Sequence, residues 1–175
     1  VIDENMNLKN VLVWLKDVEY SGEITQTPAI LDQKGCLYSP HVLGVMKGQT
    51  VLIKNSDNTL HNIHSMAEKN DQFNYAMPSV VKEKKTIFKI TEEPFYIKCD
   101  VHPWMKSWVL VEDHPYFAVT DELGNFSIEN IPPGTYEVIA WQEKFKMKRS
   151  IQKTIEIKDS SETIEDFVFI KPSKK

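Results

Sequence analysis

The chain has 175 residues, of which 41% are hydrophobic and 26% are charged, as in an ordinary globular protein with one large or two small domains. Its formal net charge of -4, with no dominant basic stripe, argues against nucleic acid as the main partner. No apolar run reaches the roughly 20 residues that would cross a bilayer. The sequence begins at Val1 without Met, which fits a mature secreted chain whose signal peptide has been removed.

Apolar and β-branched runs separated by turn residues predict an all-β protein. Short strands at this spacing are typical of sandwiches and small barrels. The polar stretch 65–85 is expected to be a long loop with room for one helical turn. The expected strands, in chain order, cover residues 11–15, 42–46, 51–53, 86–90, 95–97, 108–111, 117–119, 126–128, 136–141, 151–157 and 167–170.

The character of the sequence changes near residues 112–115. Both cysteines, most of the methionines and all histidines except His114 precede this point, and β-hairpin patterning follows it. The sequence therefore predicts one domain over residues 24–112. A second, smaller domain is expected over residues 113–175 together with residues 1–23.

The sharpest local feature is a Cys-x-x-His-x-x-Met run formed by Cys99, His102 and Met105, directly after the expected strand at 95–97. His61 lies upstream, shortly after another expected strand. A thiolate, two imidazoles and a weak thioether are the ligand set of a blue-copper electron-transfer site. Soft sulfur favours Cu(I) while imidazole tolerates Cu(II), so a compromise geometry keeps reorganisation small. The pattern predicts one mononuclear copper ion bound by His61, Cys99, His102 and Met105.

Other chemistry is open for the same residues. Tetrahedral zinc on Cys and His ligands is the competing metal site, although Met is a poor zinc ligand. Nucleophilic catalysis by Cys99 and His102 is a further alternative, but no third residue that would orient the histidine is evident. Taken alone, a Cys or a Met in such a segment is more often a buried apolar side chain. Their combination on one short loop favours the metal site.

The segments 60–64 and 99–105, with the preceding strand segment 45–55, resemble the cupredoxin family, in particular its amicyanin- and plastocyanin-like members. The resemblance covers about residues 30–112. It implies a Greek-key sandwich with copper at one end. It also implies electron exchange with redox proteins through the exposed edge of the second histidine.

Carried over by position, the resemblance makes His61, Cys99 and His102 the equatorial ligands and Met105 the axial ligand. Asn62 would lie beside them, with its backbone N–H directed at the Cys99 sulfur and its side chain tying the two ligand loops together.

His64 is the alternative to His61 as the upstream ligand. The His-Asn order of the family falls at residues 61–62, so we expect His64 to be a surface or core-edge histidine instead.

Residues 116–170 resemble the carboxypeptidase regulatory-like, transthyretin-like β-sandwich family. The resemblance is carried by Thr-Asp-Glu-Leu-Gly-Asn-Phe at 120–126 and Pro-Pro-Gly-Thr-Tyr at 132–136. It implies a structural or adhesive module without catalytic residues. Little room for the module's first strand lies before the first motif. We therefore expect the strand at 11–15 to supply it, so that the copper domain is inserted between two strands of this module.

Cys36 is the cysteine that the cupredoxin resemblance leaves unexplained. Three outcomes are open: a buried free thiol, an extra copper ligand together with His41, or a disulfide to Cys99. A disulfide would consume the thiolate that binds the metal. His41 is poorly placed to share the ion if the segment is extended. We therefore expect a reduced Cys36 that does not bind the metal.

The basic run 144–149 is either a docking patch for an acidic redox partner or a solvated hairpin tip, and we expect the hairpin tip.

Together these features predict a blue (type 1) copper protein, not an enzyme, that transfers single electrons between a donor and an acceptor protein in the periplasm or outside the cell. One alternative is a protein that stores or delivers copper, and reversible one-electron cycling would separate the two. Another is a structural or adhesive surface protein with a cupredoxin scaffold, against which the complete ligand set argues.

Overall fold

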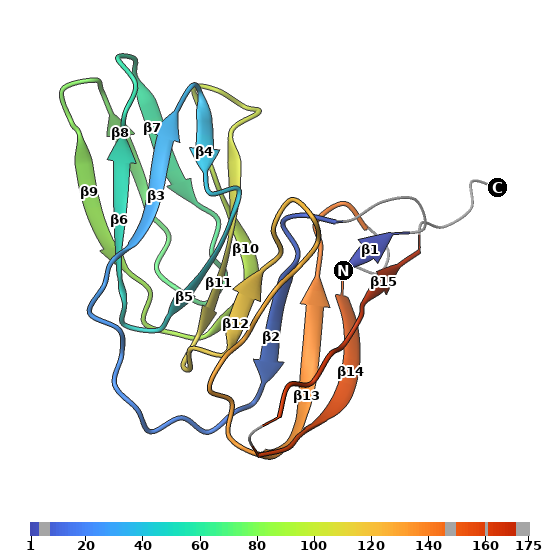
Figure 1. Ribbon diagram of the computed structural model, residues 1–175. Helices are drawn as coiled ribbons and strands as arrows, with labels where there is room; N and C mark the ends of the chain where they lie inside the picture. Colours follow the sequence, from blue (N-terminus) through green and yellow to red (C-terminus); the bar gives the residue numbers. More distant parts are fainter. Residues whose placement is uncertain (4–7, 146–149, 160, 171–175) are drawn as a thin grey trace. The chain divides into compact units, whose positions relative to one another are not determined.

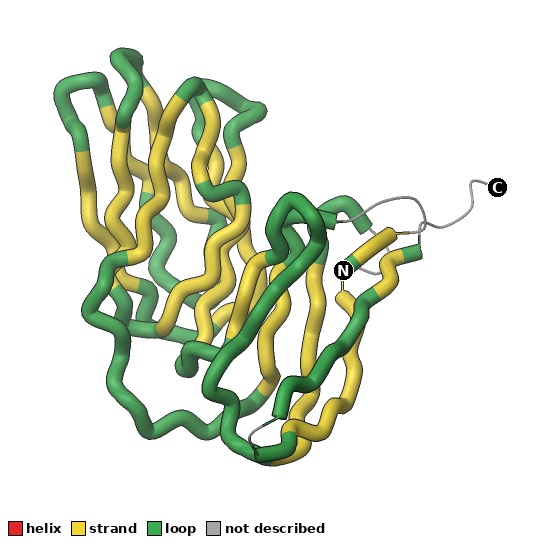
Figure 2. The backbone as a smooth tube through the Cα atoms, in the orientation of Figure 1, coloured by secondary structure: helices red, strands yellow, loops and turns green. Residues whose placement is uncertain are grey.

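The computed structural model describes residues 1–3, 8–145, 150–159 and 161–170. The chain is all-β as expected, and none of these described residues is helical (Figure 2). It divides into two compact units. We call residues 20–115 the inserted unit, and residues 1–19 with 116–175 the split unit.

The inserted unit consists of two sheets (Figure 1). The four-stranded sheet has the order β4-β3-β6-β9, with β3 at Ala29–Lys34, β4 at Leu37–Ser39, β6 at Thr50–Asn55 and β9 at Glu83–Ile87. The five-stranded sheet has the order β5-β11-β10-β7-β8, with β5 at Val42–Met46, β7 at His61–Ser65, β8 at Asn74–Met77, β10 at Glu92–Lys98 and β11 at Lys106–Glu112. The pairs β3–β6 and β5–β11 are parallel.

The core of the inserted unit lies between these sheets, because side chains alternate between the two faces of a strand. In β6, Val51 and Ile53 are buried while Leu52 and Lys54 are half-buried. One apolar cluster draws on both sheets, and burial of such faces is the main stabilising contribution to a sandwich. Its members include Leu31, Tyr38, Val45, Ile63, Met77, Phe95, Ile97 and Val109.

The split unit is built around β2 at Leu12–Lys16. Its four-stranded sheet has the order β12-β2-β13-β14, with β12 at Phe117–Val119, β13 at Gly134–Trp141 and β14 at Ser150–Ile157. A parallel pair joins β1 at Ile2–Asp3 to β15 at Val168–Phe169. Within β2, Trp14 pairs with Phe117 on one side and with Ile139 on the other. The expected pairing of the strand at 11–15 with the C-terminal strands is therefore confirmed.

The boundaries of the units differ slightly from those expected. Residues 113–115 belong to the inserted unit, where Asp113 forms an ion pair with Lys47 at 3.7 Å. Residues 20–23 belong to it as well. Of the basic run 144–149, residues 146–149 lie outside the described residues.

Some expected elements are wrong. Residues 126–128 form no strand, although they alternate in polarity; the ring of Phe126 packs instead on that of Phe167, with centroids 6.2 Å apart. The stretch 65–85 contains β8 and the start of β9, and no helical turn. The hairpin β3–β4 lies in a part of the chain where no strand was expected.

Candidate metal centre

Three connections meet at one end of the inserted unit, at the top in Figure 1. They are the turn between β3 and β4, the segment between β6 and β7, and the loop between β10 and β11. They carry Cys36, His61, and the run from Cys99 to Met105, respectively.

Asn55, the buried last residue of β6, shapes the segment that leads to His61. Its side-chain amide donates to the carbonyls of Thr59 at 3.1 Å and Met77 at 2.8 Å. Its Oδ1 accepts from the Asp57 N–H at 3.1 Å. These bonds turn the chain back so that β7 begins at His61, whose side chain is fully buried.

The loop between β10 and β11 is braced by its own backbone. The Cys99 N–H donates to the Met105 carbonyl at 3.3 Å, and the Met105 N–H donates to the His102 carbonyl at 2.9 Å. The His102 N–H donates to the Cys99 sulfur at 3.4 Å. A loop closed in this way presents its side chains in a fixed arrangement, which a metal site needs.

Two pairs of the predicted ligands approach each other, through His102. Among the described residues, however, the group of mutually close donor atoms consists of Cys36, His61 and His102 and does not include Cys99. His61 Nδ1 lies 3.1 Å from His102 Nδ1, and the Cys99 sulfur lies 3.8 Å from His102 Nδ1. Ligand atoms that share a tetrahedral ion with bonds of about 2.0–2.3 Å are about 3.3–3.8 Å apart. The donor types therefore fit a bound copper ion, and so does the spacing of Cys99 and His102, whereas the two histidine nitrogens are hydrogen-bonded to each other. Met105 is fully buried in the same apolar cluster as Cys99.

Asp57 determines which nitrogen of His61 is free to bind a metal. Its Oδ2 lies 2.8 Å from His61 Nε2. Hydrogen bonds from the Cys36 N–H, and then from Gly35 and His61, hold the pKa of Asp57 at about 2 against the opposing effect of burial. An ionised carboxylate only accepts hydrogen bonds, so Nε2 carries the proton and Nδ1 presents its lone pair. In this state His102 Nδ1 carries a proton and donates a hydrogen bond to His61 Nδ1. Metal binding displaces this proton.

Asn62 ties the two ligand segments together. Its Oδ1 accepts from the Asp100 N–H at 2.9 Å, which confirms the expected role of its side chain. The expected bond from its backbone N–H to the Cys99 sulfur stays a prediction.

The Tyr38 hydroxyl joins the same two segments: it lies 2.6 Å from the Asn62 carbonyl and 3.1 Å from the Lys98 carbonyl. Burial raises the pKa of Tyr38 well above its usual value, so the hydroxyl stays protonated and donates.

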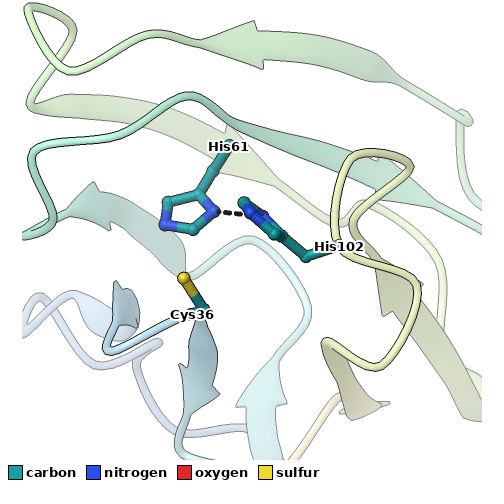
Figure 3. Close-up of side chains that lie close together, drawn as sticks. All are labelled: Cys36, His61 and His102. Atoms are coloured by element: carbon teal, nitrogen blue, oxygen red, sulfur yellow. Dashed lines mark hydrogen bonds between the residues drawn. The ribbon is translucent and has the colours of Figure 1, made fainter.

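Of the remaining candidates, His64 lies where it was expected, and Cys36 lies closer to the two histidines than a residue without a role there would need to. His64 pairs with Asp100 at 2.9 Å and is not part of the cluster, as expected. Cys36 was expected to be a reduced thiol that does not bind the metal. Its sulfur lies with ring nitrogens of His61 and His102, all three atoms being within 4.8 Å of one another, and Figure 3 shows it pointing towards the His61 ring. His41 does not belong to this described group. Cys36 and Cys99 are both free thiols, so the reduced state expected for Cys36 is confirmed.

Sequence reasoning missed two further residues of the site. Asp57 stands four residues before His61, a spacing that carries no signal unless the turn at Asn55 is known. Trp104 lies inside the ligand run, and its ring centroid is 5.3 Å from that of His102. Its indole N–H donates to the Cys36 carbonyl at 3.0 Å. An exposed tryptophan beside a predicted ligand was the available signal.

Replacing Asp57 by Ala is expected to weaken copper binding about 10- to 100-fold, the usual loss when a residue that orients a ligand histidine is removed. The His61 ring would lose the bond that fixes its tautomer. Because the pKa of Asp57 is about 2, wild-type affinity should not fall through loss of this carboxylate until the pH approaches that value. The measurement is copper affinity by competition with a chelator. Asp100→Ala is the matched control, since that carboxylate pairs with His64; equal losses in both variants would contradict the assignment.

Comparisons with known proteins give partial matches. The family model for polysaccharide lyase family 4, domain II, matches residues 89–165, less than half of the chain. No curated protein matches. Among solved structures, the copper-containing nitrite reductase from Thermus scotoductus SA-01 is 18% identical over 55% of this chain, with a TM-score of 0.46. The match spans 25% of that reductase.

Two smaller copper-protein structures match over most of their own length. A purple cupredoxin from Nitrosopumilus maritimus is 25% identical over 48% of this chain and 99% of its own, with a TM-score of 0.41. A reduced amicyanin variant is 24% identical over 51% of this chain and 87% of its own, with a TM-score of 0.43. The transthyretin-like resemblance of residues 116–170 stays a prediction.

Proposed function

We propose that this chain is a type 1 copper protein that transfers single electrons between a donor and an acceptor protein, with one copper ion held by His61, Cys99, His102 and Met105. The observation that supports this most is the approach of two donors to His102 Nδ1: His61 Nδ1 lies 3.1 Å from it and the Cys99 sulfur lies 3.8 Å from it. These atoms come from two separate connections of one sandwich.

Copper, when bound, supplies a one-electron couple at this site. The protein limits how far His61, Cys99 and His102 move between the two oxidation states. Cys99 and His61 are 1% and 0% exposed, so water has little access to either ligand. The backbone bonds of the loop 99–105 and the link from Asn62 to Asp100 resist movement of the donors. A rigid, dry site of this kind keeps the reorganisation that accompanies electron transfer small.

The face over His102 is the proposed route for electrons. His102 is only half-buried, whereas the other three proposed ligands are buried. Trp104, 64% exposed, lies against the His102 ring, and Leu60 and Val101 beside the two histidines are also exposed. An apolar surface around a partly exposed ligand suits brief contact with protein partners.

Among the described residues, no helix is long and apolar enough to cross a membrane. The proposal includes a periplasmic or secreted location and no catalytic activity of its own.

Copper storage or delivery is the second candidate, and the position of Cys36 favours it, because an additional soft sulfur beside the two imidazoles suits retention of Cu(I).

The proposal is tested by the visible spectrum and the electrochemistry of copper-loaded protein. An intense thiolate-to-copper(II) band and reversible one-electron cycling at a stable potential are expected. A band without reversible cycling would support storage or delivery. A colourless copper(II) complex would contradict a type 1 site.

Met105→Leu is expected to keep the colour and raise the reduction potential, because losing a thioether donor disfavours Cu(II). The rise should be about 60 mV for each tenfold loss of Cu(II) affinity relative to Cu(I). Voltammetry measures it, with Met46→Leu, a buried methionine of β5, as the control. Complete loss of copper in Met105→Leu would show that Met105 is a primary ligand instead.

A further inference from the structure

Cys36 occupies an unusual backbone position in the β3–β4 hairpin. Lys34 pairs with Leu37, which leaves Gly35 and Cys36 as the two central residues of the turn. Both have positive φ, at 63° and 53°. Two-residue hairpins with this geometry strongly prefer Asn, Asp or Gly, because a left-handed conformation costs other residues about 1–2 kcal/mol. A cysteine is therefore placed here at a conformational cost.

The turn is attached to the metal centre on two sides. The N–H groups of Gly35 and Cys36 donate to the Asp57 carboxylate at 2.8 Å and 2.9 Å, and the same carboxylate holds His61. The Cys36 carbonyl accepts the indole N–H of Trp104 at 3.0 Å, and Trp104 lies against His102. The two elements that position the imidazoles therefore also position the Cys36 sulfur.

The sulfur lies where an ion bound to those imidazoles could reach it. The Cys36 sulfur and one ring nitrogen each of His61 and His102 are all within 4.8 Å of one another. Cys99 approaches His102 from the β10–β11 loop, whereas Cys36 approaches from the β3–β4 turn. Cys36 is thus the thiol that is close to both imidazoles, and Cys99 adjoins this group through His102.

We infer that Cys36 is an additional metal ligand, so that the centre binds Cu(I) through the sulfurs of Cys36 and Cys99 and the Nδ1 atoms of His61 and His102. This inference rests on the proposed function, since it adds a ligand to the same copper site. On binding, the Cys36 thiol releases its proton to solvent and its sulfur forms the bond to the ion. No change in the oxidation state of sulfur or metal is needed.

A second thiolate changes what the centre holds best. Two soft sulfurs with two imidazoles form a tetrahedral set that suits Cu(I), and also Zn(II) and Co(II). The reduced ion is therefore retained more tightly than one thiolate would allow. Cys36 is half-buried whereas Cys99 is buried, so Cys36 is the more accessible of the two cysteines.

Cobalt(II) provides the direct test, because each bound thiolate adds a sulfur-to-cobalt absorption band. The wild type and the variants Cys36→Ser and Cys36→Asn are loaded with Co(II) and compared. Both substitutions should lower the band by about half, since one of two thiolates is lost. Asn suits the left-handed turn position, so Cys36→Asn separates loss of the thiol from damage to the hairpin. Leu37→Ala, an exposed change in the same hairpin, should leave the band unchanged.

Cu(I) affinity gives a second readout. In competition with a coloured Cu(I) chelator, Cys36→Ser and Cys36→Asn should bind Cu(I) at least about tenfold more weakly than the wild type.

The outcomes separate this inference from the proposed function. If the Cys36 variants keep the full cobalt band and Cu(I) affinity while Cys99→Ser loses the band, the inference is wrong and the proposed function stands. If Cys36→Ser removes the whole band and Cys99→Ser none, Cys36 is a ligand but the proposed ligand set is wrong. If the wild type shows no thiolate band, both fail.

Discussion

Replacing Cys99 by Ser is expected to remove the intense blue band of the copper(II)-loaded protein. Cys99 is the buried thiolate of the site, 1% exposed, and its sulfur lies 3.8 Å from His102 Nδ1. A short, covalent bond between copper and this sulfur is the source of such a band. Any absorption left in this variant would come from Cys36, and the double variant Cys36→Ser/Cys99→Ser should show none.

The visible spectrum of each variant at equal copper occupancy is the measurement, with circular dichroism to show that the sandwich is folded. Wild-type protein loaded with copper(I), which has no such band, serves as the colourless reference. A Cys99→Ser spectrum that matches the wild type would contradict the proposed ligand set.

Glu92→Gln is expected to lower the free energy of unfolding by about 3 kcal/mol, since hydrogen bonds to a charged group contribute about 1.5–3 kcal/mol and several are lost together. Glu92 is 5% exposed. Its carboxylate accepts from the N–H groups of Glu68, Lys69 and Asn70, and from the Asn70 side chain at 2.9 Å. An amide in its place would point N–H groups at these donors.

The effect should depend on pH in a defined direction. Burial raises the pKa of Glu92, but the hydrogen bonds from the Asn70 side chain and the backbone of residues 68–70 outweigh it and leave the pKa below its usual 4.5. The stabilisation is therefore complete above pH 4.5 and is lost as the pH falls through the folded-state pKa. The difference between wild type and Glu92→Gln should shrink over that range.

Denaturant unfolding at several pH values measures both effects. Glu93→Gln is the matched control, because Glu93 is the next residue of β10 and is exposed. The control should change stability by less than about 0.5 kcal/mol. An equal, small change in both variants would show that the carboxylate of Glu92 does not hold the 66–73 loop.

Many of the strands and the Cys-x-x-His-x-x-Met segment at residues 99–105 could be predicted from the sequence. Apolar runs such as 42–46 and 117–119 coincide with β5 and β12, since a short run of apolar and β-branched residues is a local property of the sequence. The strand at 11–15 was assigned to the C-terminal sheet because that sheet otherwise lacked an edge neighbour, a long-range argument that the pairing with Phe117 and Ile139 confirms.

The parts that escaped prediction depend on contacts between distant residues. A Gly-Cys turn does not carry the usual hairpin sequence, so the position of Cys36 follows only from the bonds of its backbone to Asp57 and Trp104. Strand β8 has three exposed residues out of four, and an edge strand without alternating burial has no periodic signal. Phe126 alternates like a strand residue, yet an aromatic contact with Phe167 takes the place of pairing.

The position of β2 in the chain has a consequence for the order of folding. Its sheet neighbours β12 and β13 follow the whole inserted unit, so a ribosome has made that unit before β2 has anything to pair with. Until then the apolar residues Leu12 to Leu15, which are buried in the folded protein, have no neighbouring strands to cover them. A folded insert holds its two ends in place, which lowers the entropy cost of bringing β2 and β12 together compared with a flexible chain of the same length. Biosynthesis should therefore complete the metal centre first, and its folding should guide assembly of the sheet that surrounds β2.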